Sequence, residues 1–201
     1  MTVVFGTTDG DTLLGKNGDD VFEGNSGDDR LQGGNHDDFL KGDSGDDLLQ
    51  GGNHDDILSG GSGDDLLQGG YHDDMLYGDS GDDLLQGGHH DDLLEGGSGN
   101  DSLMGGVGND TLNGGDGNDS FIFTSLNGVN TITDFDGDRG DKIIFDAATG
   151  VSEIADITVH VGVSHNHVLE SKQITSLYVD EMRIIEFDRV VSLQVEDFEF
   201  I

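Results

Sequence analysis

The sequence contains no cysteine, no proline and no tryptophan. Without cysteine, no disulfide can cross-link the fold. Basic residues are also scarce, because 8 lysines and arginines stand against 43 aspartates and glutamates, giving a formal charge of -35. This charge would repel the phosphates of nucleic acids and anionic membrane surfaces, so we expect neither nucleic-acid binding nor membrane insertion. Cations are the partners that such a charge favours.

Long apolar runs and a basic leader are missing as well. No stretch approaches the ~20 apolar residues of a membrane helix, and residues 1–6 lack the basic and apolar regions of a Sec-type signal peptide. Glycine is abundant instead, with 35 residues. This density excludes long helices, because each interior glycine costs roughly 1 kcal/mol relative to alanine. High acidity with low hydrophobicity is typical of disorder, but here the acidic residues follow a strict period.

Residues 6–122 divide into 13 consecutive blocks of nine residues without an insertion. Position 1 is always glycine, position 6 is always aspartate, and position 8 is leucine in eleven blocks and phenylalanine in two. Nine residues make about 2.5 turns of an α-helix, so a helix would place successive leucines on opposite sides. A short strand over positions 7 to 9, preceded by a six-residue glycine-rich turn, explains the pattern better. Two blocks then form one coil, with position 8 packed between two parallel sheets.

The consensus G-G-x-G-x-D-x-U-x resembles the RTX (repeats-in-toxin) nonapeptide, a Ca²⁺-binding parallel β-helix repeat. Residues 60–68 and 114–122 follow the consensus closely. The resemblance implies an all-β fold, a right-handed parallel β-roll that is a two-sheet solenoid with two nonapeptides per coil, over residues 1–122. Alternating apolar residues near 157, 176 and 183 predict a small β-rich C-terminal cap over residues 123–201.

The repeats contain the oxygen ligands that calcium requires. Ca²⁺ takes about 6–8 oxygens, which position-6 carboxylates and converging turn carbonyls can supply. In the RTX family each ion lies between two stacked turns on one edge, so the resemblance implies at most about 11 such ions. The alternative, aspartates that only solvate turns, explains the composition but not the unbroken register. The predicted calcium ligands are Asp11, Asp20, Asp29, Asp38, Asp47, Asp56, Asp65, Asp74, Asp83, Asp92, Asp101, Asp110 and Asp119.

The predicted core is thin, which makes folding depend on the ions. One buried leucine per block contributes ~1.5–3 kcal/mol, whereas ordering the glycine-rich turns costs ~1–2 kcal/mol per residue. Ion binding must supply the remainder, so we expect a chain that is disordered without Ca²⁺ and folded with it. Such a chain would fold only where calcium is plentiful, which predicts a secreted, extracellular protein.

Position 4, usually glycine, is histidine in every second block from 36 to 90. An 18-residue spacing is one coil, so these side chains should stack along one edge ~4.8 Å apart. Histidine either replaces glycine because it tolerates the left-handed backbone conformation, or forms a surface ladder that binds a transition metal or changes charge near pH 6. The four histidines are His36, His54, His72 and His90.

Apolar and glutamine side chains should cover the outer faces of the two sheets. Position 7 carries Phe39, Ile57, Met75 and Leu93 on one sheet and Leu48, Leu66 and Leu84 on the other, and position 9 carries Gln32, Gln50, Gln68 and Gln86. Exposed apolar rows often mark contacts, such as self-association or docking of a parent exoprotein domain. Alternatively, these residues reflect only the β-propensity of branched and apolar side chains.

The segment after residue 123 resembles the C-terminal region of secreted RTX proteins. Residues 131–143 are similar to the family's I-x-D-F-x-x-G-x-D-x-I segment, and residues 190–200 to its terminal L-x-x-x-D-F-x-F. In that family an uncleaved C-terminal signal directs export by the type I secretion machinery. Four carboxylates here either hold one further Ca²⁺ or form a solvated acidic turn: Asp134, Asp136, Asp138 and Asp141. His165 and His167 are expected in a surface turn.

The sequence has no motif of a catalytic site. It lacks the H-E-x-x-H metalloprotease helix, the G-x-S-x-G elbow and the phosphate-binding P-loop. We therefore expect no enzyme, but a calcium-binding module that aids folding and secretion of an RTX exoprotein. The alternative is an extracellular adhesion or surface-assembly element that uses the apolar and glutamine rows.

Overall fold

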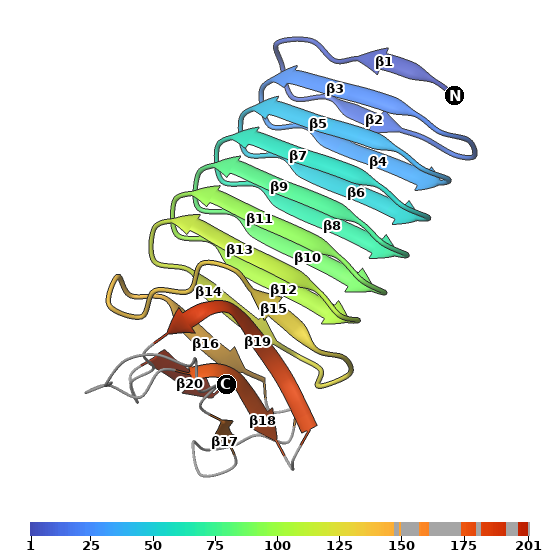
Figure 1. Cartoon of the computed structure of the whole chain (residues 1–201). Coiled ribbons are helices and arrows are strands. Elements are labelled where there is room, and N and C mark those ends of the chain that lie inside the picture. Colours follow the sequence, from blue (N-terminus) through green and yellow to red (C-terminus); the bar gives the residue numbers. More distant parts are fainter. Residues whose placement is uncertain (147–148, 150–156, 161–173, 180–181, 192–196, 201) are drawn as a thin grey trace.

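The computed structural model describes residues 1–146, 149, 157–160, 174–179, 182–191 and 197–200. In these residues every regular element is a β-strand, and the strands stack as a two-sheet solenoid with the N-terminal strands at one end and the C-terminal strands at the other (Figure 1). This arrangement confirms the predicted all-β, parallel roll. No helix within the described ranges is long and apolar enough to cross a membrane.

Each sheet takes every second strand of the repeat region. Within the described residues one sheet has the order β1 (Val3–Phe5), β3 (Val21–Ser26), β5 (Phe39–Ser44), β7 (Ile57–Ser62), β9 (Met75–Ser80), β11 (Leu93–Ser98), β13 (Thr111–Asp116), β15 (Asn130–Ile132), β19 (Met182–Val191), β18 (Ile174–Val179) and β17 (Ile157–His160). The other has the order β2 (Thr12–Leu14), β4 (Arg30–Asn35), β6 (Leu48–Asn53), β8 (Leu66–Tyr71), β10 (Leu84–His89), β12 (Ser102–Val107), β14 (Ser120–Phe123), β16 (Lys142–Phe145) and β20 (Phe198–Phe200).

Parallel pairing with an 18-residue offset confirms that two blocks make one coil. Leu58 in β7 pairs with Leu40 in β5 and with Leu76 in β9. The strands are longer than predicted, because most span six residues, positions 7 to 9 of one block and 1 to 3 of the next. The turn is therefore only positions 4 to 6. Position 1 lies within the strand and is always glycine, because the position-6 carboxylate of the same block occupies the space that a Cβ would need.

The core is a single column of position-8 side chains between the two sheets. Leucines from Leu31 to Leu112 are fully buried, and Phe121 is the last member of the column within the repeats. Ile132 and Ile143 extend it beyond the repeats, since Ile132 pairs with Leu112 and Ile143 with Phe121. One apolar residue per turn gives a core one side chain thick, as the sequence predicted.

Both sheets continue past residue 122. β15 and β16 add parallel strands to β13 and β14, and β19 and β20 follow them, again in parallel. β18 and β17 then join β19 in antiparallel fashion. These strands confirm the three alternating segments predicted near residues 157, 176 and 183, whereas His165 and His167 lie outside the described residues.

Candidate metal centre

The position-6 aspartates form two ladders of carboxylates, one along each edge of the roll where the chain passes between the sheets. In each rung, the backbone N–H of one aspartate donates to Oδ1 of the aspartate in the next coil, at 2.6–3.1 Å. The first edge carries Asp11, Asp29, Asp47, Asp65, Asp83, Asp101 and Asp119; the second carries Asp20, Asp38, Asp56, Asp74, Asp92 and Asp110. We call these rows the position-6 ladders.

The second oxygen of these carboxylates is buried without a partner. Ten Oδ2 atoms are inaccessible and accept no hydrogen bond in this structure, those of Asp29, Asp38, Asp47, Asp56, Asp65, Asp74, Asp83, Asp92, Asp101 and Asp110. A buried charged oxygen with no partner is strongly unfavourable, and buried charges in proteins are normally paired or coordinate a metal. The regular recurrence of this atom on both edges makes these oxygens candidate ligands for a cation.

Burial also raises the pKa of these carboxyl groups, and neighbouring carboxylates raise it further. The pKa of Asp74 and of Asp92 is raised to about 8. That of Asp56 and of Asp65 is raised to about 7. For Asp38, Asp47, Asp83, Asp101, Asp110 and Asp119 it is raised to about 6. Hydrogen bonds from the previous coil act in the opposite direction but do not offset burial. Near neutral pH the groups whose pKa is about 7 or 8, in the middle of the ladders, therefore retain protons in part or in the main unless a cation replaces them.

Backbone carbonyl oxygens lie close to the same turns. The carbonyl oxygen of Gly45 approaches Gly63 of the next coil so closely that a Cβ there would overlap with it. Gly63 has φ +126, in the left-handed region that only glycine adopts easily. On the second edge the carbonyl oxygen of Gly34 approaches Gly52 in the same way. Carboxylate and carbonyl oxygens are hard donors of the kind that Ca²⁺ prefers, so the residues present fit calcium.

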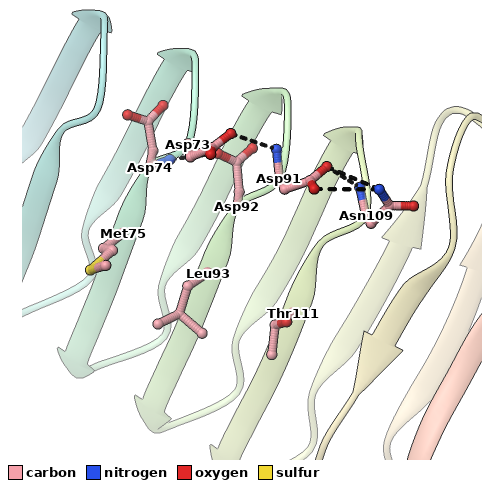
Figure 2. Close-up of a pocket in the computed structure, with 8 residues that line it drawn as sticks. All are labelled: Asp73, Asp74, Met75, Asp91, Asp92, Leu93, Asn109 and Thr111. Carbon is pink, nitrogen blue, oxygen red and sulfur yellow. Dashed lines mark hydrogen bonds between the residues drawn. The ribbon is translucent and has the colours of Figure 1, made fainter.

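The position-5 residues form a second, exposed ladder beside each position-6 ladder. Here the hydrogen bonds run in the opposite direction, because the backbone N–H of Asp91 donates to Oδ1 of Asp73 at 3.1 Å, and that of Asn109 to Oδ1 of Asp91 at 2.8 Å. Figure 2 shows these residues around a shallow hollow of about 290 Å³, with the buried carboxylates of Asp74 and Asp92 beside them. The two ladders concentrate negative charge at each edge of the roll.

Two residues beyond the repeats prolong the position-6 ladders: Asn130, which sequence reasoning missed, and Asp141, which it named as a candidate ligand of a separate acidic cluster. The N–H of Asp119 donates to Oδ1 of Asp141, and the N–H of Asp110 donates to Oδ1 of Asn130, each at 3.0 Å. Their spacings of 22 and 20 residues differ from the 18 of the repeats. A usable signal was present, since each residue stands two positions before a buried isoleucine, Ile132 or Ile143, as position 6 stands two positions before position 8.

The other three carboxylates predicted near Asp141 have different surroundings. Asp134 accepts the N–H groups of Gly114 and Gly115, at 3.0 and 2.6 Å. Asp136 is ion-paired with Arg139, whereas Asp138 is exposed. No group of three or more His, Cys, Asp or Glu side chains within the described ranges is arranged to hold one metal ion. The structure thus does not gather the four carboxylates on one centre, and an ion shared by all four stays a prediction.

The histidines at position 4 form a stack on the second edge, as predicted. His36, His54, His72 and His90 have φ between +77 and +81, which confirms that they replace glycine in the left-handed conformation. Neighbouring ring centroids are 5.0–5.2 Å apart and the rings are within 13° of parallel. The aspartates two residues after them, Asp38, Asp56, Asp74 and Asp92, belong to the position-6 ladder of this edge, and their Oδ2 atoms are buried as on the first edge.

The outer faces of the sheets carry the predicted rows. Phe39, Ile57 and Met75 are exposed on the longer sheet. On the other sheet the glutamine side chains are linked, because the amide of Gln50 donates to Gln68 at 2.7 Å and that of Gln68 to Gln86 at 2.8 Å. The apolar row borders the second carboxylate edge, since Met75 and Leu93 line the same hollow as Asp74 and Asp92 (Figure 2).

Comparison with known families identifies the repeat. A family model described as the RTX calcium-binding nonapeptide repeat matches in four copies, over residues 5–35, 32–67, 68–103 and 95–125. The matches extend over most of the roll and end before Asn130 and Asp141. No curated protein sequence matches the chain.

Proposed function

The chain belongs to the family of RTX calcium-binding nonapeptide repeats, and we propose that it is a module that folds by binding Ca²⁺ outside the cell. The single observation that carries this proposal is the row of ten buried, unpartnered Oδ2 atoms along the two edges. Up to about 11 ions, one between each pair of stacked repeat turns, would neutralise the ladders. The position-6 aspartates and the turn carbonyls are the proposed ligands.

In this proposal calcium acts on folding through charge and solvation. Without the ion, closing the roll buries carboxylates beside one another, and their mutual repulsion and desolvation oppose folding. With the ion, each buried Oδ2 gains a partner of opposite charge, and the binding free energy becomes folding free energy. A chain of this kind would stay extended where calcium is scarce and close after export. That order of events suits passage through a secretion channel.

A calcium titration tests the folding proposal directly. Far-ultraviolet circular dichroism should change from a disordered spectrum in chelator to a β spectrum in excess Ca²⁺, and native mass spectrometry should count the bound ions. Mg²⁺ is the matched control, because it requires near-ideal octahedral geometry and gives up its water reluctantly. A full β spectrum in chelator at neutral pH would contradict the proposal.

The role in secretion rests on the C-terminal resemblance and needs its own test. Residues 131–143 and 190–200 are similar to the terminal segments of exported RTX proteins. The full chain, expressed in bacteria that carry a type I secretion apparatus, should accumulate in the medium, whereas a chain truncated after residue 189 should stay inside. Equal export of both chains would remove the C-terminal segment from the secretion mechanism without affecting the calcium proposal.

A second candidate function, surface adhesion or assembly, is favoured by the outer faces. The exposed Phe39, Ile57 and Met75 form an apolar row, and the glutamines on the opposite sheet form a regular amide row. Light scattering in Ca²⁺ distinguishes the two candidates. A monomer at all concentrations argues against assembly, and larger species that disappear when the three apolar residues are replaced by serine support it.

A further inference from the structure

The four stacked histidines form a row of imidazoles along the second edge, which we call the imidazole ladder: His36, His54, His72 and His90. All four side chains are exposed. Their rings are nearly parallel, with centroid spacings of 5.2, 5.0 and 5.0 Å. The solenoid therefore presents identical nitrogen ligands at a regular interval, which folding of the roll fixes in place.

Each imidazole is followed by an exposed aspartate of the position-5 ladder, Asp37, Asp55, Asp73 or Asp91. These carboxylates and the formal charge of -35 create a negative potential that attracts cations to this edge. Imidazole nitrogen suits Cu²⁺, Ni²⁺ and Zn²⁺, whereas Ca²⁺ prefers oxygen. The imidazole ladder and the carboxylate ladders therefore differ in the ions that they select.

Nδ1 of His90 has two backbone neighbours that favour different tautomers. The backbone N–H of His72 donates to it at 3.2 Å, and the carbonyl oxygen of His89 lies 3.1 Å from it. A metal at Nε2 requires the tautomer with a proton on Nδ1, which then donates to the carbonyl of His89 instead of accepting from His72. Metal-ligating histidines usually donate their second ring N–H to such a backbone oxygen, so metal binding at this ring exchanges one hydrogen bond for the other.

The spacing determines how many imidazoles one ion can take. A metal binds imidazole through a lone pair in the ring plane, so two metal–nitrogen bonds of about 2.0–2.1 Å at tetrahedral or octahedral angles place the two nitrogens about 2.9–3.4 Å apart. Parallel rings whose centroids are 5.0 Å apart must therefore turn their edges toward each other and bring these nitrogens roughly 2 Å closer, by side-chain rotations that exposed residues make readily. A third ring would be two coils away, and no group of three metal-binding side chains is arranged on one centre within the described residues. An ion on this edge thus takes two neighbouring imidazoles, with water as its other ligands.

We propose that the imidazole ladder binds divalent transition-metal ions, Cu²⁺, Ni²⁺ or Zn²⁺, each between the imidazoles of two neighbouring coils. Four rungs hold two ions without sharing a ligand, one on His36 and His54 and one on His72 and His90. The site needs the folded roll, because only stacking of the coils brings residues 18 positions apart together. It does not compete with calcium for a side-chain ligand.

The test compares two double variants that keep the same number of histidines. H72N/H90N leaves His36 and His54 as neighbours, whereas H36N/H72N leaves His54 and His90 two coils apart. Asparagine suits the site, because Asn25 of this chain has φ +76. The quadruple variant H36N/H54N/H72N/H90N measures binding by all other groups, including His89, His160, His165 and His167. A histidine tag must be absent, and excess Ca²⁺ must be present so that the roll is folded.

Calorimetric titration with Ni²⁺, supported by the visible absorption of added Cu²⁺, gives the stoichiometry. The full chain should bind two ions above the quadruple variant, and H72N/H90N should bind one. H36N/H72N should bind at least tenfold more weakly than H72N/H90N. Equal binding by the two double variants, or by the full chain and the quadruple variant, would overturn the proposal. If an asparagine variant loses its β spectrum, the glycine pair H72G/H90G and H36G/H72G repeats the comparison with the residue found at position 4 on the first edge.

Discussion

The backbone N–H of Asp56 donates to Oδ1 of Asp74 in the next coil at 2.8 Å. The same carboxylate has its Oδ2 buried without a partner. Burial, with the charges of Asp56 and Asp92, raises the pKa of Asp74 to about 8. One oxygen is thus committed to holding the coils in register, and the other must be neutralised. This relationship recurs along both edges and links calcium, protons and folding.

The first prediction is that acid favours the calcium-free roll. The folded state binds protons on carboxyl groups with pKa about 6 to 8, whereas the unfolded chain releases them near the ordinary value of 3.8. This contribution to stability is complete below about pH 4 and is lost as the pH rises through about 6 to 8. In chelator, circular dichroism should therefore show more β structure at about pH 4.5 than at about pH 8. More structure at the higher pH would contradict the account.

Calcium should reverse this dependence on pH. The ion requires deprotonated carboxylates, so its apparent affinity should fall as protons compete below about pH 6. A series of calcium titrations at fixed pH values measures the effect. A midpoint independent of pH would mean that the buried carboxylates are not the ligands.

The second prediction concerns one carboxylate in the middle of the second edge. Asp74→Asn leaves the shape but removes the charge, so in Ca²⁺ it should lower the free energy of unfolding by about 1–3 kcal/mol. The exposed Asp73→Asn is the matched control and should change it by less than about 0.5 kcal/mol. Urea unfolding at a fixed calcium concentration measures both. In chelator at neutral pH the sign should reverse for Asp74→Asn, because the variant no longer buries a charge beside Asp56 and Asp92.

Sequence reasoning recovered the features that the period itself determines. An invariant glycine, an aspartate at position 6 and an apolar residue at position 8 predicted the two-block coil, the single buried column and both carboxylate edges. It also predicted that His36 and its equivalents would stack, since 18 residues make one coil. Each of these features follows from the position of a residue within the nine-residue block, and this position can be read directly from the sequence.

Features that depend on close contact between coils were not visible. The strands are six residues long and include the position-1 glycines, where the position-6 carboxylate of the same block leaves no room for a Cβ. Asn130 and Asp141 join the ladders across insertions that break the period, so counting by nine does not reach them. The hydrogen bond from the backbone N–H of His72 to Nδ1 of His90 depends on the orientation of the histidine side chain, which no sequence pattern reports.

The third prediction tests the thin core. Leu67 is fully buried at position 8 of the central coils, whereas its neighbour Leu66 at position 7 is only partly buried on the outer face. Leu67→Ala should lower the free energy of unfolding in Ca²⁺ by about 2–5 kcal/mol. Leu66→Ala should cost less than about 1 kcal/mol, because much of that side chain remains in water. Thermal unfolding in excess calcium checks both values, and equal costs would mean that the column does not form the core.

The fourth prediction compares position 4 on the two edges. On the first edge Gly63 has φ +126, and any Cβ there would overlap with the carbonyl oxygen of Gly45. Gly63→Ala should therefore destabilise the calcium-bound roll by about 1–3 kcal/mol through backbone strain and displacement of that carbonyl.

On the second edge His72 has φ +81, and the backbone there already accommodates a Cβ. His72→Gly should lower the stability by no more than about 1 kcal/mol, because glycine adopts the same conformation and the change acts mainly through the greater freedom of the unfolded chain. Calcium-dependent thermal unfolding of the two variants measures the contrast. A harmless Gly63→Ala would show that the first edge can also carry side chains at position 4.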